Sequence, residues 1–159
     1  MKESANPIDE LYRLHGKSIL RYLQRFVGDA ECAQDLLQET FAVAVRRPAC
    51  IAEATSPRAW LFAVARNMGM NALRRRRRFA ALPPHLAANG RSPDARIEEM
   101  LQAIANLPDI EREALELRLR EDLSYREIAT VLKIPVGTVR SRLHRAVQRL
   151  RSRLNPVGD

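Results

Sequence analysis

Hydrophobic residues along the chain recur at steps of three and four, the period of a helix buried on one side and not the alternation of a strand. In the first half this period covers residues 8–26, 33–44 and 57–78. Gly28 suits the end of the first helix and Asp29 the cap of the second, because glycine adopts positive φ and aspartate accepts from free N–H groups. Between residues 47 and 57 the period is lost, so we expect a loop there. The pattern predicts three main helices.

A second helical region lies near the C-terminus, where two patterns flank a tight break. Ser124 and Glu127 have the spacing of a capping box, which predicts a helix from Tyr125 to about Leu132. Pro135 then stops or restarts the helix, because proline lacks an N–H and is tolerated only in a first turn. The long helix beyond it should bury one stripe, formed by Val139, Leu143, Val147, Leu150 and Leu154. Together the two patterns predict a helix-turn-helix.

The segment from residue 79 to 95 separates the two regions. Three prolines and Gly90 interrupt any helical period in it, so we interpret it as a flexible linker. Only 5% of the residues are aromatic although 46% are apolar, which favours helical packing over a sheet. We therefore expect an all-α fold of two small helical domains, residues 1–78 and 96–159, the second containing the helix-turn-helix.

Charge is sorted unevenly along the chain, whose net charge is +8 and whose pI is about 10.4. No acidic residue occurs from residue 128 to 158, whereas residues 96–127 hold nine acids and five arginines. A charge run alone is most simply a solvated helix face. Combined with the capping box and the break, the acid-free stretch favours DNA as the partner over a neutral small molecule.

Other classes of protein fit the sequence less well. A membrane-surface protein is compatible with the charge, but no apolar stretch approaches spanning length and the N-terminus lacks the core of a signal peptide. We expect a cytoplasmic protein without membrane insertion. Cys32 and Cys50 lack ligand neighbours, which predicts two small packing residues and no metal site. The three histidines and scattered acids form no cluster for a nuclease or recombinase, so we expect no enzyme activity, catalytic residue or cofactor.

Two polar helix faces are candidates for nucleic-acid contact. On the C-terminal helix, the side away from the apolar stripe carries Ser141, His144, Arg145 and Gln148, with Arg140 and Arg151 on one flank and Arg142, Arg149 and Arg153 on the other. Outward residues near the start of such a helix reach base edges, and flanking arginines reach phosphates. The helix of residues 57–78 carries a second polar stripe, formed by Trp60, Asn67, Asn71 and Arg74.

This second stripe suits melted DNA, because amides can pair with a base edge and an indole can stack on an unpaired base. A place at the edge of the core is an equally good interpretation for Trp60. The five arginines at 74–78 favour phosphate binding, since adjacent like charges repel unless an anion screens them. Asp35, Gln38 and Glu39 lie on the outer side of the preceding helix, where plain solvation is the simpler interpretation of the pattern.

Four segments resemble the extracytoplasmic-function sigma factors of the sigma-70 family. In order, they are DLLQETF (35–41), SPRAWLFAVARN (56–67), LPDIEREALELR (107–118) and GTVRSRL (137–143). The likeness covers residues 8 to about 154 and implies a promoter-specificity subunit of bacterial RNA polymerase. The main alternative is a helix-turn-helix regulator that is not a polymerase subunit. Such a repressor usually needs a dimerisation surface, and it would leave the polar stripe on residues 57–78 unexplained.

The resemblance implies three groups of site residues and their partners. Asp35, Gln38 and Glu39 would bind the β′ clamp coiled coil of core RNA polymerase, which replaces the solvation interpretation. At the minus-10 element, the 47–57 loop would hold a flipped base, and the strand contacts would be Trp60, Asn67, Asn71, Arg74 and Arg75. The C-terminal domain would pack on the β flap and read the double-stranded minus-35 element with Thr138, Arg140, Ser141, His144, Arg145 and Arg149.

The sequence departs from the family pattern at the turn. Lys133 stands where related helix-turn-helices often have glycine, and a left-handed conformation there would cost roughly 1 kcal/mol. His144 and the tip of the 47–57 loop vary within such families, so the promoter sequence stays open. Neither an autoinhibitory N-terminal region nor a C-terminal extension is expected. Regulation would then come from outside, through an anti-sigma protein that covers the polymerase-binding faces.

Overall fold

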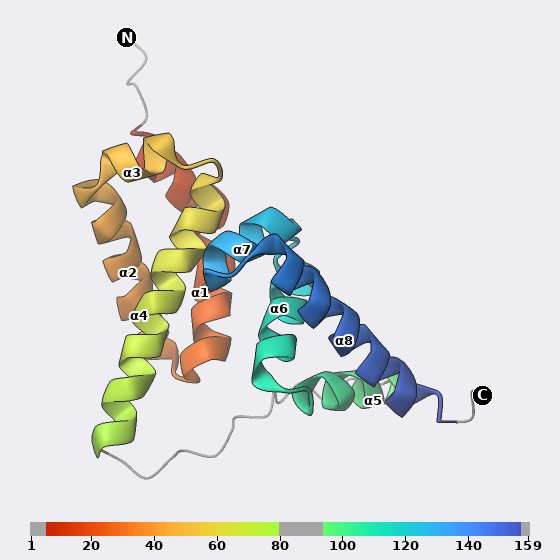
Figure 1. Ribbon diagram of the computed structural model, residues 1–159. Helices are drawn as coiled ribbons and strands as arrows, with labels where there is room; N and C mark the ends of the chain where they lie inside the picture. The colour runs from red at the N-terminus through yellow and green to blue at the C-terminus, as the bar shows by residue number, and fades with distance from the viewer. Residues whose placement is uncertain (1–5, 80–93, 157–159) are drawn as a thin grey trace. The chain divides into compact units, whose positions relative to one another are not determined.

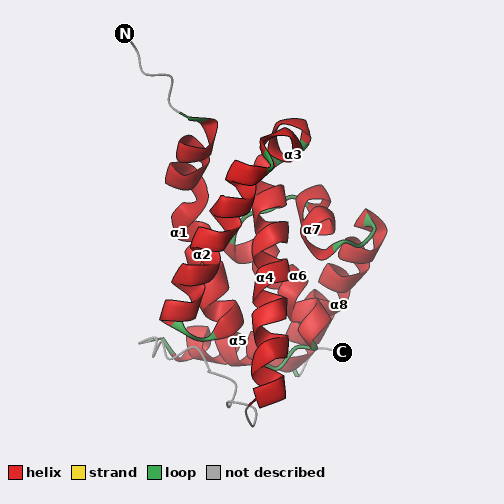
Figure 2. Ribbon diagram, turned by 90° about the vertical axis from the view of Figure 1, so that its left-hand side faces the viewer, coloured by secondary structure: helices red, strands yellow, loops and turns green. Residues whose placement is uncertain are grey.

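A computed structural model of the chain describes residues 6–79 and 94–156, which form helices joined by turns and include no strand (Figures 1 and 2). The helices are α1 (Pro7–Val27), α2 (Ala30–Arg46), α3 (Pro48–Glu53), α4 (Pro57–Phe79), α5 (Ala95–Ala105), α6 (Asp109–Arg120), α7 (Tyr125–Leu132) and α8 (Val136–Leu154). The chain divides into two compact units between Leu86 and Ala87. This confirms the predicted all-α fold. Most of the predicted 79–95 linker lies outside the described residues, so its limits stay a prediction.

In the N-terminal unit, α1, α2 and α4 pack along one another, and α3 contacts α2 and α4 at one end of the bundle (Figure 1). The inward face predicted for α2 is buried throughout, at Ala33, Leu36, Leu37, Thr40, Phe41 and Ala44. The Thr40 hydroxyl donates to the Leu36 carbonyl at 2.7 Å, so this buried polar group is satisfied within its own helix. The buried faces of α1, α2 and α4 therefore meet in one continuous core.

The corner between α1 and α2 forms as the sequence predicts. Gly28 ends α1 with φ 72°, in the left-handed region, and its N–H donates to the Gln24 carbonyl. Asp29 caps α2, because its Oδ1 accepts from the N–H groups of Glu31 at 2.9 Å and Cys32 at 3.2 Å. Two residues thus turn the chain and satisfy backbone groups on both sides of the turn.

The expected loop between residues 47 and 57 is wrong in part, because residues 48–53 form the short helix α3. Pro48 opens this helix at its first position, where the missing N–H costs nothing, and Ile51 is buried against the bundle. A helix of six residues is too short to show a hydrophobic period. Cys50 on the same helix is exposed, so the prediction that both cysteines are packing residues is also wrong.

Gly69 allows α4 to approach α1 closely. A Cβ added at this position would lie 2.7 Å from Cδ1 of Phe26 on α1, which is shorter than carbon atoms tolerate. Phe26 is held in turn by Tyr22, with ring centroids 5.7 Å apart. Glycine in the middle of a helix usually costs about 0.5–1 kcal/mol relative to alanine, and here the close helix contact offsets that cost. The side of α4 at Gly69 is therefore fixed against α1.

In the C-terminal unit, α8 contacts each of α5, α6 and α7. The capping box is present: Ser124 Oγ accepts from the Glu127 N–H, and Glu127 Oε1 accepts from the Ser124 N–H, both at 3.1 Å. Helix α7 starts and ends as predicted. Lys133 then adopts φ 55° and ψ 47°, so the turn uses the left-handed conformation without the usual glycine. Pro135 is the N-cap of α8 and lies just outside the helix.

The buried stripe of α8 follows the prediction only as far as Leu143, since Leu150 and Leu154 are half-buried. Val139 and Leu143 are buried as expected, but Val147 is 38% exposed and Ala146 is fully buried in its place. Ala146 lies three residues after Leu143, closer to the centre of the face that meets the other helices. A small alanine attracts less notice than valine in a hydrophobic pattern, although it allows the helices to approach closely.

Candidate nucleic-acid interface

The polar stripe predicted on α4 lies on the side away from its packed face. Asn67 and Asn71 are each two residues from Gly69, so at about 100° per residue they point about 160° away from the contact with α1. Both are exposed, as are Arg74 and Arg75. Asn71 Oδ1 accepts a hydrogen bond from Arg74 Nη1 at 3.4 Å. The structure therefore groups amides and guanidinium groups on one open face.

Trp60 stands at the start of the same stripe, nine residues before Gly69 and about 180° around the helix. Its side chain is half-buried, whereas its neighbours Ala59 and Leu61 are buried in the core. The hydroxyl of Ser56 accepts from the Ala59 N–H at 3.1 Å, which caps the start of the helix. A half-buried indole at a capped helix start is held in place and still presents part of its surface, so stacking on a base stays a prediction.

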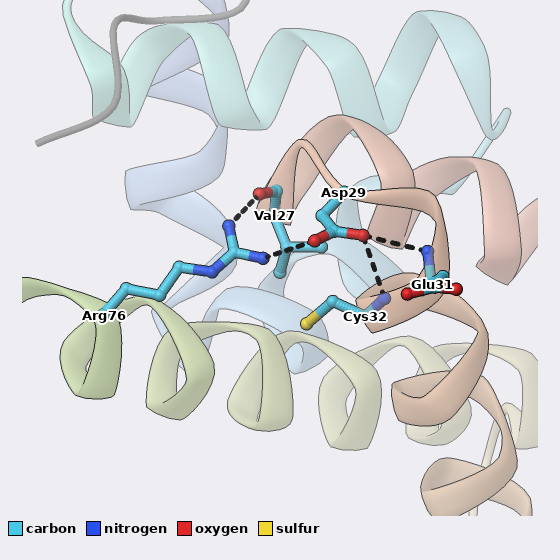
Figure 3. Close-up of polar contacts among 5 residues, drawn as sticks. All are labelled: Val27, Asp29, Glu31, Cys32 and Arg76. Carbon is cyan, nitrogen blue, oxygen red and sulfur yellow. Dashed lines mark hydrogen bonds and ion pairs between the residues drawn. The ribbon is translucent and has the colours of Figure 1, made fainter. Parts of the chain in front are cut away.

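The five arginines that end α4 are not equivalent, which the sequence did not reveal. Arg76 turns back toward the α1–α2 corner, where Nη1 donates to the Val27 carbonyl at 2.6 Å and Nη2 lies 3.4 Å from Asp29 Oδ2 (Figure 3). Its side chain is 32% exposed. The other four, Arg74, Arg75, Arg77 and Arg78, are exposed. One arginine of the run thus serves the fold and four remain on the surface.

The outer side of α2 carries the predicted polymerase-facing group. Asp35, Gln38 and Glu39 are all exposed. At about 100° per residue, Asp35 and Glu39 lie opposite the buried Leu37. Gln38 lies on the flank, about 60° around the helix from the buried Phe41. No hydrogen bond or ion pair within the described chain explains their arrangement. This surface is polar and acidic. It lies on a helix whose inner face is packed in the core, so the backbone holds these side chains in fixed positions.

On α8, the predicted reading residues are exposed: Arg140, Ser141, His144 and Arg145. Thr138 is half-buried in the first turn. Ser141 Oγ donates to the Gly137 carbonyl at 3.0 Å, which leaves its lone pairs toward solvent. The structure therefore brings these side chains together on the face of α8 that no other described helix of the C-terminal unit covers.

Arg149 has a partner that the sequence did not reveal. Its Nε lies 2.9 Å from Oε2 of Glu111 on α6, and the Glu111 side chain is only 4% exposed. Glu111 Oε2 has no hydrogen bond within the described residues, so this ion pair is what compensates the buried charge. The rest of the Arg149 side chain stays accessible, since the side chain is 55% exposed. Its predicted DNA contact stays a prediction, but the side chain also holds α8 to α6.

Two further classes of site were sought in the described chain. Residues 6–79 and 94–156 contain no group of three or more His, Cys, Asp or Glu side chains that could hold a metal ion. Within these same ranges, none of the helices combines the length and apolar character needed to cross a membrane. The candidate surfaces are therefore three helix faces. The face on α2 is acidic, and the faces on α4 and α8 are polar and basic, which suits nucleic acid.

Two family models match the chain and together cover most of it. The model for sigma-70 region 2 matches residues 11–79, and the model for sigma-70 region 4 matches residues 97–150. The first match spans nearly all of α1 to α4 and the second spans α5 to the later part of α8. A helix-turn-helix regulator needs no counterpart of region 2, so the match to the N-terminal unit argues against that alternative.

Curated proteins show the same relationship along the whole chain. The chain is 38% identical over 158 residues to the ECF RNA polymerase sigma factor SigL of Mycobacterium tuberculosis, covering 93% of this chain and 89% of that protein. It is 35% identical over 170 residues to the RNA polymerase sigma-H factor of Pseudomonas aeruginosa, covering 94% and 86%. Among solved structures, the sigma factor RpoE of Bartonella quintana, determined with the anti-sigma factor NepR, has a TM-score of 0.68 at 24% identity over 95% of this chain and 98% of that one.

These matches define a two-unit helical transcription factor with a helix-turn-helix in its second unit. The chain belongs to the extracytoplasmic-function sigma factors of the sigma-70 family and is an RNA polymerase sigma factor. The resemblance seen in the four sequence segments is thereby confirmed.

Proposed function

We propose that this sigma factor opens promoters by presenting the polar face of α4 to one strand of the minus-10 element. The observation that carries the proposal is the arrangement of α4 about its axis. Gly69 is fixed against α1, and the residues about 160° to 180° around the helix are Trp60, Asn67 and Asn71, with Arg74 and Arg75 continuing the face. Amides and an aromatic face suit unpaired bases, and the arginines suit the backbone of the same strand.

In the same proposal, α8 reads the minus-35 duplex. Arg140, Ser141, His144 and Arg145 lie on its uncovered face, Thr138 lies in its first turn, and Arg149 offers its Nη groups to a phosphate from the flank. An α-helix fits the major groove, where each base pair has its own pattern of donors and acceptors. The absence of acids from residue 128 to 158 removes charge repulsion from this approach.

The polymerase contacts are proposed on the outer face of α2 and on the C-terminal unit. Asp35, Gln38 and Glu39 form an exposed acidic and amide group that suits the β′ clamp coiled coil, and the C-terminal unit would pack on the β flap. An anti-sigma protein that covers these faces would control access to polymerase. Support comes from the sigma factor RpoE of Bartonella quintana, which has the same fold and was solved with the anti-sigma factor NepR.

Transcription from a randomised promoter library tests the proposal. The full chain and core RNA polymerase are incubated with duplexes carrying two randomised blocks, and the templates that yield transcripts are sequenced. We expect enrichment in both blocks, with the downstream preference weakened in Asn67→Ala and the upstream preference weakened in Arg145→Ala. Binding of duplexes without any transcript in the presence of core enzyme would instead indicate a regulator that does not act as a polymerase subunit.

A preference for unpaired DNA is the sharper test of the minus-10 part. The full chain should bind the downstream sequence more tightly as a single strand than as a duplex, and Asn67→Ala should reduce the difference. Arg78→Ala is the matched control, since it removes a neighbouring basic group on the same helix without touching the amides. Equal binding of both forms by the wild-type protein would show phosphate attraction alone and refute single-strand reading.

A further inference from the structure

Arg76 lies in the middle of the basic run on α4, yet its side chain contacts the corner between α1 and α2 and does not extend into solvent as its neighbours do. Its Nη1 donates to the Val27 carbonyl at 2.6 Å, and its Nη2 is 3.4 Å from the carboxylate of Asp29 (Figure 3). Val27 is the last residue of α1, so its carbonyl has no N–H partner within the helix. Asp29 is the N-cap of α2. One guanidinium therefore binds both the last carbonyl of α1 and the N-cap carboxylate of α2.

The electrostatics of this corner favour the arrangement. A helix C-terminus attracts a cation and a helix N-terminus attracts an anion, so Arg76 and Asp29 each stand at the end that suits their charge. Asp29 divides its two oxygens between these tasks: Oδ1 accepts from the first turn of α2, and Oδ2 faces Arg76. The planar fork of arginine can reach two acceptors at once, which a lysine ammonium does less well.

Arg76 and Gly69 lie on the same side of α4. They are seven residues apart, which is within about 20° of two full turns. Gly69 meets Phe26, and Arg76 meets Val27 in the next residue of α1. Two contacts at separate heights along one helix fix its rotation as well as its position. Without the contact of Arg76 with Val27 and Asp29, the C-terminal end of α4 would lose its hydrogen bond and its ion pair to the α1–α2 corner.

Three of the residues that the proposed function assigns to the minus-10 strand, Asn71, Arg74 and Arg75, lie on α4 between Gly69 and Arg76. Asn71 is two residues from Gly69, and Arg74 is two residues before Arg76, so both point about 160° away from the fixed side. Any rotation at Arg76 would move Arg74 and Arg75 around the helix axis together. The direction of the short Asn71 amide therefore depends on Arg76, whereas the long arginine side chains still reach phosphates after a small rotation.

We propose that Arg76 is a positioning residue for strand reading: it makes no DNA contact, and its clamp on the α1–α2 corner holds the Asn71 to Arg75 face toward the minus-10 strand. This inference rests on the proposed single-strand reading by α4. Its distinguishing property is that loss of Arg76 reduces sequence selectivity without removing a phosphate contact. A basic residue that binds phosphate shows the opposite pattern, because its loss weakens all sequences alike and lowers the salt dependence.

The test uses the full-length chain and an oligonucleotide that the wild-type chain selects from a randomised single-stranded pool, compared with a scrambled order of the same bases. Affinities for both are measured at several salt concentrations, far below the unfolding temperature of each variant. In Arg76→Gln we expect the preference for the selected over the scrambled strand to fall several-fold, with the salt slope unchanged. In the matched control Arg75→Gln we expect equal weakening on both strands and a salt slope smaller by about 0.7.

Asp29→Asn provides a second variant that lies on a different helix. Asparagine is as good an N-cap as aspartate, so α2 keeps its cap while the charge facing Arg76 is lost. We expect the selectivity of Asp29→Asn to fall in the same direction, and the double variant with Arg76→Gln to lose less than the product of the two single losses. Arg76→Lys should recover part of the selectivity.

The possible results separate the two proposals. A wild-type chain that selects no sequence from the pool refutes single-strand reading, and the salt slopes of Arg76→Gln and Arg75→Gln on the scrambled strand then still decide whether Arg76 contacts phosphate. With wild-type selection present, a reduced salt slope in Arg76→Gln overturns the positioning role in favour of a phosphate contact. An unchanged slope with unchanged selectivity overturns it in favour of a cap that serves stability alone.

Discussion

In each of the two basic helices, α4 and α8, an arginine contacts a carboxylate of its own unit, but the two carboxylates differ in burial. Arg149 pairs with Glu111, whose side chain is 4% exposed, whereas Arg76 pairs with Asp29, whose side chain is 51% exposed. A buried carboxylate has lost its water and depends on its partner, while a half-exposed one is still solvated. The same residue type in similar basic helices therefore has a large role in stability in one unit and a modest one in the other.

Removal of Arg149 should have the largest effect on stability. Arg149→Ala leaves Glu111 buried without a partner and should lower the free energy of unfolding by about 3–5 kcal/mol. Arg76→Ala should cost only about 1–2 kcal/mol, because it loses one hydrogen bond and a half-exposed ion pair. Urea unfolding of the full-length variants measures both.

A double replacement checks the cause of that difference. Glu111→Leu combined with Arg149→Met removes both charges and should restore most of the stability lost in Arg149→Ala, since an apolar pair of similar volume often equals or exceeds a buried ion pair. If Arg149→Ala costs no more than Arg76→Ala, the contrast in burial between the two clamps has no energetic meaning.

Within α8, variants of Arg145 and Arg149 should distinguish a contact with base edges from electrostatic attraction to phosphates. Arg145 is exposed on the uncovered face, so Arg145→Ala should lose about 1–3 kcal/mol on the preferred minus-35 duplex and relax selectivity there. Arg149→Lys keeps a charge beside Glu111 and should change binding to every duplex alike. Titrations of matched and scrambled duplexes at several salt concentrations measure this, and uniform effects of both variants would make α8 an electrostatic anchor.

The turn before α8 offers a way to assign unfolding transitions to the two units. Lys133 has φ 55°, a conformation that costs a residue with a Cβ about 1–2 kcal/mol and glycine almost nothing. Lys133→Gly should therefore stabilise the C-terminal unit by about 1 kcal/mol and leave the N-terminal unit unchanged. Calorimetry should show one shifted transition, which identifies the unit that Arg149→Ala weakens. A lower midpoint in Lys133→Gly would mean that the lysine side chain makes a compensating contact.

The smallest effect on stability is expected at the exposed carboxylates of α2. Reversing charge at Asp35 and Glu39 together should change the free energy of unfolding by only a few tenths of a kcal/mol, because neither is buried. Affinity for core RNA polymerase should nevertheless fall. Glu10→Lys on α1 is the control, since it reverses another exposed carboxylate, whose surface pair with Arg13 is worth little. Unchanged affinity in the α2 variant would exclude this surface as the docking site.

The sequence predicted the parts of the fold that depend on neighbours along the chain. The caps at Asp29 and Ser124 and the inward face of α2 were found in advance because each is a local pattern of spacing. Helix α3 was missed because six residues show no period. The partners of Arg76 and Arg149 were missed for another reason: Arg76 pairs with a residue 47 positions away, and no spacing rule links two helices that meet only after folding.

The candidate site shows the same division. The outward faces of α4 and α8 follow from helical geometry alone, so most of the predicted residues are exposed, while Trp60 and Thr138 are half-buried. Which arginine of a run faces inward depends on the neighbouring helix, and five identical residues carry no information about it. The resemblance in four segments supplied the roles proposed for these faces, which charge and periodicity alone left open between solvation and binding.

Gly69 also limits how far the N-terminal unit can vary in sequence. Any side chain there must displace the Phe26 ring or separate α4 from α1, and inserting atoms into such a contact typically costs about 1–3 kcal/mol. Gly137 at the start of α8 has nothing within 4 Å of an added Cβ, so substitution there meets no steric barrier in the free protein. The two glycines thus differ in mutational tolerance. A larger residue can replace Gly137 without a steric clash in the free protein, whereas almost any replacement of Gly69 disturbs the packing of α4 on α1.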